Sequence, residues 1–192
     1  VVILNGVDHE RFNPNRRHDS GERTRREFGI QPKDRVVLFV GSGFRRKGLD
    51  RLLRLWQEPA APEAYLLVVG NDSHLAAYRS AWRGSRHVIF VGRKTNIQDY
   101  YAAADVLVLP SIQEAFGNVV LEAFASGLPV ITVAGVGAFD KVEGDLRFGI
   151  LENPEDTTEL KTKLSFFLDP ARWSSLSREA RKAAEQYSWN SY

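Results

Sequence analysis

Residues 106–133 read VLVLPSIQEAFGNVVLEAFASGLPVITV, and their pattern gives the strongest indication of the fold class. Two short apolar runs, 106–109 and 129–133, enclose a polar loop and a helical pattern at 118–126. Continuous apolar runs that end at Pro, Gly or Ser are typical of strands buried on both faces. A strand, a helix and a second strand in this order predict a right-handed βαβ unit with parallel strands.

The same alternation of strands and helices extends toward both ends of the chain. Further buried strands are expected at 36–40, 65–69 and 87–91, with a weaker one near 148–151. Helical patterns occur at 20–28, 48–56, 74–82, 97–104, 155–168 and 170–187. Ser20 is the expected N-cap of the first helix. The predicted fold is therefore α/β, a Rossmann-like parallel sheet flanked by helices.

The length of 192 residues suits one domain with a substantial core. Four apolar residues at 1–4 and the polar, Pro-containing stretch that follows them predict a linker at 1–17, followed by the folded domain at 18–192. The chain has no Met and begins at Val1, and it is interpreted as a fragment.

Composition excludes several classes of function. The net charge of +2 gives no global reason to expect nucleic acid or an anionic membrane as partner, so an anion site has to be local. The absence of Cys rules out disulfides, thiolate metal sites and a Cys nucleophile, and it fits a cytoplasmic protein. The four His residues are scattered and there is no Asp-x-Asp pattern, so no metal is expected.

A glycine-flanked cationic loop follows the strand at 36–40, with the sequence GSGFRRKG at 41–48. Its cations are Arg45, Arg46 and Lys47. Gly41 and Gly43 allow the backbone to approach a ligand, and cations at a strand-to-helix turn can face phosphate oxygens. The loop matches neither the P-loop nor the dinucleotide fingerprint. Taken alone, it is explained equally well as a solvated basic turn.

A second candidate loop, 110–118, follows the strand at 106–109 and contains Glu114. Glu122 lies about one turn inside the helix that follows. Carboxylates accept pairs of sugar or ribose hydroxyls, and the helix amides of Gly117, Asn118 and Val119 suit phosphate oxygens. The alternative is an exposed Glu114 and a Glu122 paired with an Arg. A third loop at 92–95 carries Arg93 but is by itself a generic turn.

Six blocks in this order resemble the retaining glycosyltransferases of family four, which have the two-domain GT-B architecture. They are Asn5-Gly6-Val7-Asp8 with Phe12 and Pro14; Phe39-Val40-Gly41 with Lys47-Gly48; Phe90-Val91-Gly92-Arg93; Ala103-Ala104-Asp105 with Leu109-Pro110-Ser111; Glu114-Ala115-Phe116-Gly117; and Glu122-Ala123 with Ser126-Gly127-Leu128-Pro129-Val130. The form of the 41–48 loop is most similar to the lipopolysaccharide core glucosyltransferase I group.

This resemblance implies a role for each matching residue. Arg46 and Lys47 would contact the donor diphosphate, Glu122 the ribose and Glu114 the donor sugar, with Glu114, Arg46 and Lys47 as the catalytic set. The donor site would also include Gly41, Gly43, Arg45, Arg93, Phe116, Gly117, Asn118 and Val119. Two positions depart from the family pattern. Ser42 replaces a common Arg, and Asp140 stands where Glu is usual.

The implied function is transfer of a hexose, glucose in particular, from a UDP-sugar to a glycan or lipopolysaccharide-core acceptor with retention. The resemblance implies no cofactor and no metal, with UDP-glucose as the donor. An N-terminal domain outside this chain would bind the acceptor, and the whole protein would be cytoplasmic or peripheral to the inner membrane. Two alternatives stay open: a nucleotide-binding regulatory module, and a nicotinamide-dependent oxidoreductase that lacks the glycine fingerprint.

Overall fold

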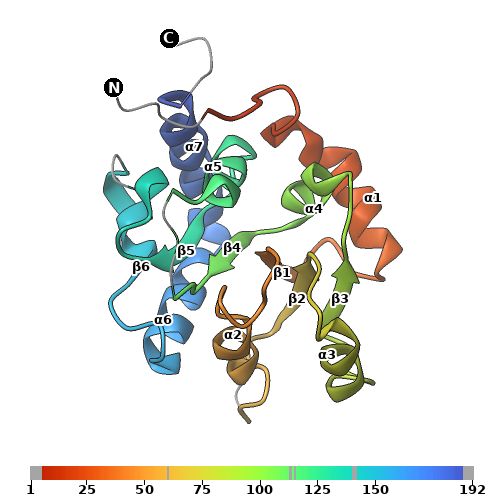
Figure 1. The fold of residues 1–192 in the computed structure, drawn as a ribbon. Coiled ribbons are helices and arrows are strands. Elements are labelled where there is room, and N and C mark those ends of the chain that lie inside the picture. Colours follow the sequence, from red (N-terminus) through yellow and green to blue (C-terminus); the bar gives the residue numbers. More distant parts are fainter. Residues whose placement is uncertain (1–5, 60, 113, 115, 140–141, 188–192) are drawn as a thin grey trace.

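One parallel sheet of six strands organises the molecule (Figure 1). The computed structural model describes residues 6–59, 61–112, 114, 116–139 and 142–187. The strands are β1 (Arg35–Val40), β2 (Ala64–Val69), β3 (Val88–Gly92), β4 (Val106–Leu109), β5 (Val130–Val133) and β6 (Ile150–Leu151). Their order is β3-β2-β1-β4-β5-β6, and every neighbouring pair is parallel. The predicted Rossmann-like α/β class is confirmed.

Helices cover both faces of this sheet. They are α1 (Ser20–Glu27), α2 (Leu49–Leu55), α3 (Leu75–Ala81), α4 (Ile97–Ala103), α5 (Asn118–Ala125), α6 (Thr157–Phe167) and α7 (Pro170–Glu185). Figure 1 shows α1, α4, α5 and α7 on one side of the sheet and α2, α3 and α6 on the other. This double cover explains why β1, β2 and β4 are apolar along almost their whole length.

The strand order creates a switch point between β1 and β4. The chain leaves β1 for β2 on one side, whereas β4 continues to β5 on the other. The loops that follow β1 and β4 therefore diverge from a common place at the carboxyl edge of the sheet. In open α/β sheets this crevice is where ligands bind.

Two local expectations need correction. Ser20 is not the N-cap, because the 3-10 helix η1 (Pro14–His18) runs almost directly into α1 and leaves Asp19 at the cap position. The Ser20 hydroxyl instead donates to the Arg16 carbonyl at 3.3 Å. The last strand is shorter than expected, because η3 (Gly144–Gly149) occupies the residues just before it.

Asp105 anchors the opposite, amino edge of the sheet. Its buried carboxylate accepts hydrogen bonds from Arg17 at 2.5 Å, from Arg25 at 2.8 Å and from the Val36 amide at 2.8 Å. The Trp173 indole donates to the Asp105 carbonyl at 3.1 Å. These bonds tie η1, α1 and α7 to the starts of β1 and β4, so the Asp105 block of the resemblance has a structural role here.

Residues 6–18, which fall within and just after the predicted linker, pack against the domain. Val7 and Phe12 are buried, and the Val7 amide donates to the Tyr187 carbonyl at 3.2 Å. Arg181 of α7 donates to the Phe12 carbonyl at 3.2 Å. A further 3-10 helix, η2 (Gly137–Phe139), follows β5. Within the described residues, no helix combines the length and apolar character needed to cross a bilayer.

Candidate functional site at the switch point

The loops after β1 and β4 touch one another at the switch point. The Ile112 amide donates to the Arg46 carbonyl at 3.0 Å, and the Ser111 hydroxyl donates to the same oxygen at 3.3 Å. Gly48 makes this approach possible. Its φ is 82°, and a Cβ added there would lie 1.9 Å from the Pro110 carbonyl oxygen. A larger residue at position 48 would therefore force the loops apart.

Lys47 and Glu114 form an ion pair across these two loops. Their side chains are only 13% and 14% exposed. The Lys47 stem runs beneath Gly41, since a Cβ added to that glycine would lie 3.3 Å from the lysine Cγ. The fold thus brings together a cation and a carboxylate that lie 67 residues apart in sequence. Glu114 is described although its two neighbours in the chain are not.

A cleft of about 640 Å³ opens at the carboxyl edge of the sheet; Gly41, which covers the Lys47 stem, lines it, whereas the side chains of Lys47 and Glu114 do not. It is lined by the ends of β1 and β2 and by the loops after β1, β2 and β3, including Gly41, Gly43, Asp72, Arg93 and Lys94. Its volume is within the range of small-molecule sites. Arg93 thus lies in the same cleft as Gly41 and Gly43. The residues next to Arg93 in the sequence do not indicate this.

Asp72 is a residue of this cleft that the sequence analysis missed. Its carboxylate accepts from the Phe44 amide at 2.7 Å and from the His74 amide at 2.8 Å. These hydrogen bonds, above all the one from the His74 amide, lower the pKa of Asp72. The residue therefore holds the loop after β2 against the glycine loop. The sequence does contain a signal for this role. Asp72 follows two residues after the glycine at the end of a strand, where Asp favours a turn held by a side-chain-to-backbone hydrogen bond.

Glu122 lies in α5 and faces α4. Its carboxylate accepts a hydrogen bond from the Tyr101 hydroxyl at 2.7 Å. Burial raises the pKa of Glu122, and the Tyr101 bond and the charge of Arg11 act in the opposite direction. One alternative above was an ion pair between Glu122 and an Arg; the partner of Glu122 is instead Tyr101. The helical pattern at 97–104 does not distinguish Tyr101 from a core residue, because its ring is buried against Phe12.

The remaining predicted residues divide into two groups. Gly117, with φ 79°, is the N-cap of α5, and Asn118 and Val119 are the first residues of that helix. A Cβ added to Gly117 would lie 3.5 Å from the Glu114 Cγ, so the glutamate lies close to the helix start. Phe116 packs edge-to-face on Tyr187. Arg45 and Arg46, by contrast, line an adjoining hollow beside α3, which shares Gly43 and Asp72 with the cleft.

Asp140, which departs from the family pattern, lies outside the described residues together with its neighbour Lys141. Within the described part of the chain, no group of three His, Asp or Glu side chains is arranged to hold a metal ion.

Comparisons with known proteins agree with this architecture. A family model described as "Glycosyl transferases group 1" matches residues 20–187. The chain is 33% identical over 191 residues to the sulfoquinovosyl transferase SQD2 of Arabidopsis thaliana, covering 96% of this chain and 36% of that protein. It is 37% identical over 126 residues to the lipopolysaccharide glucosyltransferase WaaG of Escherichia coli, covering 62% of this chain and 33% of that protein.

A solved structure shows the same fold. The crystal structure of WaaG, a glycosyltransferase involved in lipopolysaccharide biosynthesis, superposes with a TM-score of 0.78 and 29% identity, covering 96% of this chain and 52% of that chain. The fold and the switch-point cleft define a Rossmann-type domain of the GT-B class. The chain belongs to the group 1 glycosyltransferase family. It spans between a third and about half of the length of these relatives, as expected of the C-terminal half of a GT-B enzyme.

Proposed function

We propose that this chain is the donor-binding half of a retaining glycosyltransferase that transfers a hexose, glucose in particular, from a UDP-sugar to a glycan or lipopolysaccharide-core acceptor. The Lys47–Glu114 pair carries the proposal, because it places a cation and a hydroxyl acceptor side by side at the ligand crevice. A nucleotide sugar needs both groups, one for its diphosphate and one for its sugar. The family membership supports the same reaction class.

The described side chains suggest how the donor lies. The nucleoside occupies the cleft near Arg93. The diphosphate binds the Lys47 ammonium and replaces Glu114 as its ionic partner. Glu114, released from that pair, accepts hydroxyls of the sugar. Glu122 accepts ribose hydroxyls on the α4 side. Arg46 reaches the diphosphate only by turning its side chain out of the neighbouring hollow.

Bond cleavage at the anomeric carbon builds negative charge on the leaving diphosphate and positive charge on the sugar. Lys47 and the cations of its loop stabilise the first charge more in the transition state than in the ground state. Glu114 stabilises the second. No metal or other cofactor enters this scheme, because side-chain cations and backbone amides do the work that a metal would do on the phosphates.

The acceptor side of the reaction belongs to the rest of the enzyme. The acceptor is a glycan or glycolipid, held mainly by an N-terminal domain, and the whole protein works on the cytoplasmic side, peripheral to the inner membrane. The chain alone is therefore expected to transfer no sugar, because catalysis requires both reactants in one geometry. Acceptor-dependent turnover by residues 1–192 would contradict this division of labour.

A thermal-shift series tests the donor class. UDP and UDP-glucose are compared with ADP, GDP and NAD, each at the same concentration, because a ligand that binds the native state raises the Tm by an amount that grows with the ratio of its concentration to its Kd. UDP and UDP-glucose should shift the Tm and NAD should not. Stabilisation by NAD alone would overturn the proposal in favour of the oxidoreductase. If UDP binds but the full-length protein shows no turnover, the regulatory module becomes the better description.

A further inference from the structure

One face of the domain is strongly cationic. Residues 73–98 contain five Lys and Arg and no Asp or Glu. Because the whole chain has 26 Lys and Arg and 24 Asp and Glu, all other residues together carry 21 against 24. The net positive charge of the chain therefore comes entirely from this segment, which we name the acid-free segment.

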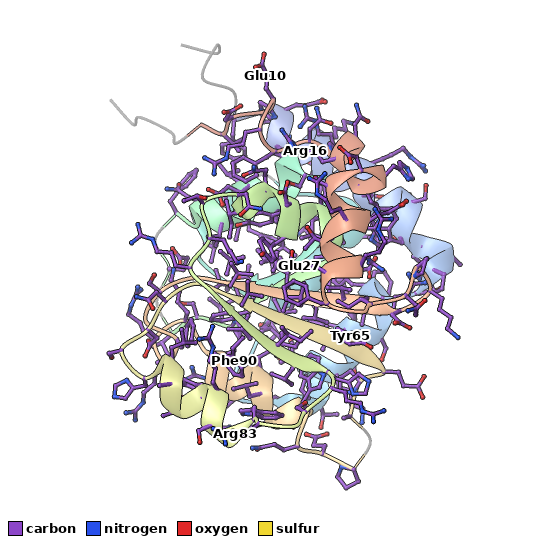
Figure 2. All side chains as sticks on the ribbon, turned by 90° about the vertical axis from the view of Figure 1, so that its right-hand side faces the viewer. Glu10, Arg16, Glu27, Tyr65, Arg83 and Phe90 are labelled. Carbon is purple, nitrogen blue, oxygen red and sulfur yellow. The ribbon has the colours of Figure 1, made fainter. Side chains whose placement is uncertain are left out.

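The acid-free segment forms one continuous edge of the molecule. It consists of α3, the edge strand β3 and the turns around them. Figure 2 looks onto this edge and shows the labelled Arg83 beside α3 and Phe90 on β3. None of the seven residues of α3 is buried. Arg79, Arg83 and Arg86 therefore carry the charge of the outer edge, whereas Arg93 and Lys94 line the cleft described above.

The nearest acid on this side of α3, Asp50, accepts a hydrogen bond from the Tyr78 hydroxyl at 2.6 Å and not from an arginine. Arg79 donates to the carbonyls of Phe90 and Val91 at 3.0 and 3.4 Å, which covers part of the open edge of β3 without cancelling the charge. Arg83, Arg86 and Arg93 are exposed. Over the described part of the chain, these four arginines form no ion pair.

An apolar hollow of about 780 Å³ adjoins the same helix. It is lined by Ala77, Tyr78 and Ala81 of α3 and by Ile112 of the loop after β4. Ile112 is 62% exposed, more than any other large apolar side chain among the described residues. The guanidinium side chains of Arg45 and Arg46 add further cations to the rim. Asp72 also lines the hollow, and its carboxylate is engaged by the Phe44 and His74 amides.

We propose that the acid-free segment and the adjoining hollow dock this domain on an anionic lipid bilayer. Exposed arginines beside an apolar patch are the combination that binds an anionic membrane surface, with phosphates at the cations and the apolar side chain in the interface. Nucleic acid fits less well, because stacking on bases requires exposed aromatic faces. Tyr78 and Trp82 pack partly against the core, and the exposed apolar residue is the aliphatic Ile112.

This inference rests on the proposed function in one respect: a glycolipid acceptor lies at a membrane, so docking of the donor domain would bring the donor to it. It differs from attachment through the N-terminal domain, because the described residues of this chain supply the contact. Vesicle binding requires neither nucleotide nor turnover. The two proposals can therefore fail separately.

The test is co-sedimentation of the chain with vesicles of phosphatidylcholine alone and with vesicles that also contain phosphatidylglycerol. We expect binding only to the anionic vesicles, lost at high salt. The double variant Arg83→Gln/Arg86→Gln should bind on the order of 30-fold more weakly. The matched control is Arg23→Gln/Arg26→Gln on α1, which removes the same charge from another exposed surface and should change binding much less.

Three results separate the possible outcomes. Ile112→Ser should also weaken vesicle binding, and the Arg83→Gln/Arg86→Gln variant should bind UDP as the parent chain does. Equal losses in the α1 control and in the Arg83/Arg86 variant would overturn a specific docking face. Binding to a single-stranded RNA oligonucleotide but not to anionic vesicles would assign the face to nucleic acid instead.

Discussion

Lys47 and Glu114 pair across the switch point, and each is the other's ionic partner in a place where both are largely shielded from water. The pair joins the loop after β1 to the loop after β4. A bound nucleotide sugar would replace this contact by two others, phosphate on the lysine and sugar hydroxyls on the glutamate. The pair therefore keeps two oppositely charged groups in position while the site is empty.

Replacing Lys47 by Ala should weaken UDP binding by about 1–3 kcal/mol, the scale of one lost charge-assisted hydrogen bond. Calorimetric titration of the folded variant measures this directly. Lys33→Ala, which removes an exposed lysine away from the cleft, is the control and should leave the affinity unchanged. Equal UDP affinity in the Lys47→Ala variant and the parent chain would remove Lys47 from the site.

The two glutamates should separate in kinetics of the full-length enzyme. Glu114→Gln should lower kcat more than donor affinity, because a contact with the sugar strengthens as positive charge builds there. Glu122→Gln should instead raise the donor KM, since the ribose does not react. UDP binding by each variant is measured in parallel after circular dichroism. Loss of UDP binding in Glu114→Gln with none in Glu122→Gln would reverse the proposed orientation of the donor.

Glu122 should also make stability depend on pH. Burial raises its pKa in the folded protein, so the folded state holds this proton more tightly than the unfolded chain does. Its contribution to stability is full below the unfolded pKa and is lost as the pH rises through the folded value. The stability of Glu122→Gln relative to the parent chain should therefore increase from acidic to neutral pH. Urea unfolding of both proteins at several pH values checks this, and a difference independent of pH would contradict it.

Asp105→Asn should destabilise the fold without acting on the cleft. The substitution leaves the side chains of Arg17 and Arg25 without their buried carboxylate, which costs about 3–5 kcal/mol when one partner of a buried pair is removed. Asp19→Asn, at a carboxylate that is 86% exposed, is the control and should cost well under half as much. Urea unfolding gives the difference. UDP affinity of the folded Asp105→Asn protein should remain unchanged, because Asp105 lies at the opposite edge of the sheet.

Sequence periodicity predicted most of the fold and only part of the site. All six strands lie within or next to the expected runs, because strands buried on both faces leave an unbroken apolar signal. The sequence also predicted that the loops after β1 and β4 bind a ligand, because glycines and charged residues directly after parallel strands are typical of ligand-binding loops.

The missed features are tertiary. The Tyr101–Glu122 hydrogen bond joins α4 to α5, and no local pattern encodes which helices become neighbours. The hollow that Arg45 and Arg46 line beside α3 is likewise formed by segments distant in sequence, and the loop sequence does not indicate it. The Ser20 cap was wrong because a 3-10 turn precedes α1, and its hydrogen bonds depend on contacts that a helical pattern does not contain.

We propose that a nucleotide sugar bridges Lys47 and Glu114, and a crystal structure of this chain with UDP-glucose would show the contacts themselves. The diphosphate should lie within hydrogen-bond distance of the Lys47 ammonium, with the glucose hydroxyls on the Glu114 carboxylate and the uracil near Arg93. A donor bound away from the switch point, or turned so that uracil lies at Glu114, would refute this arrangement.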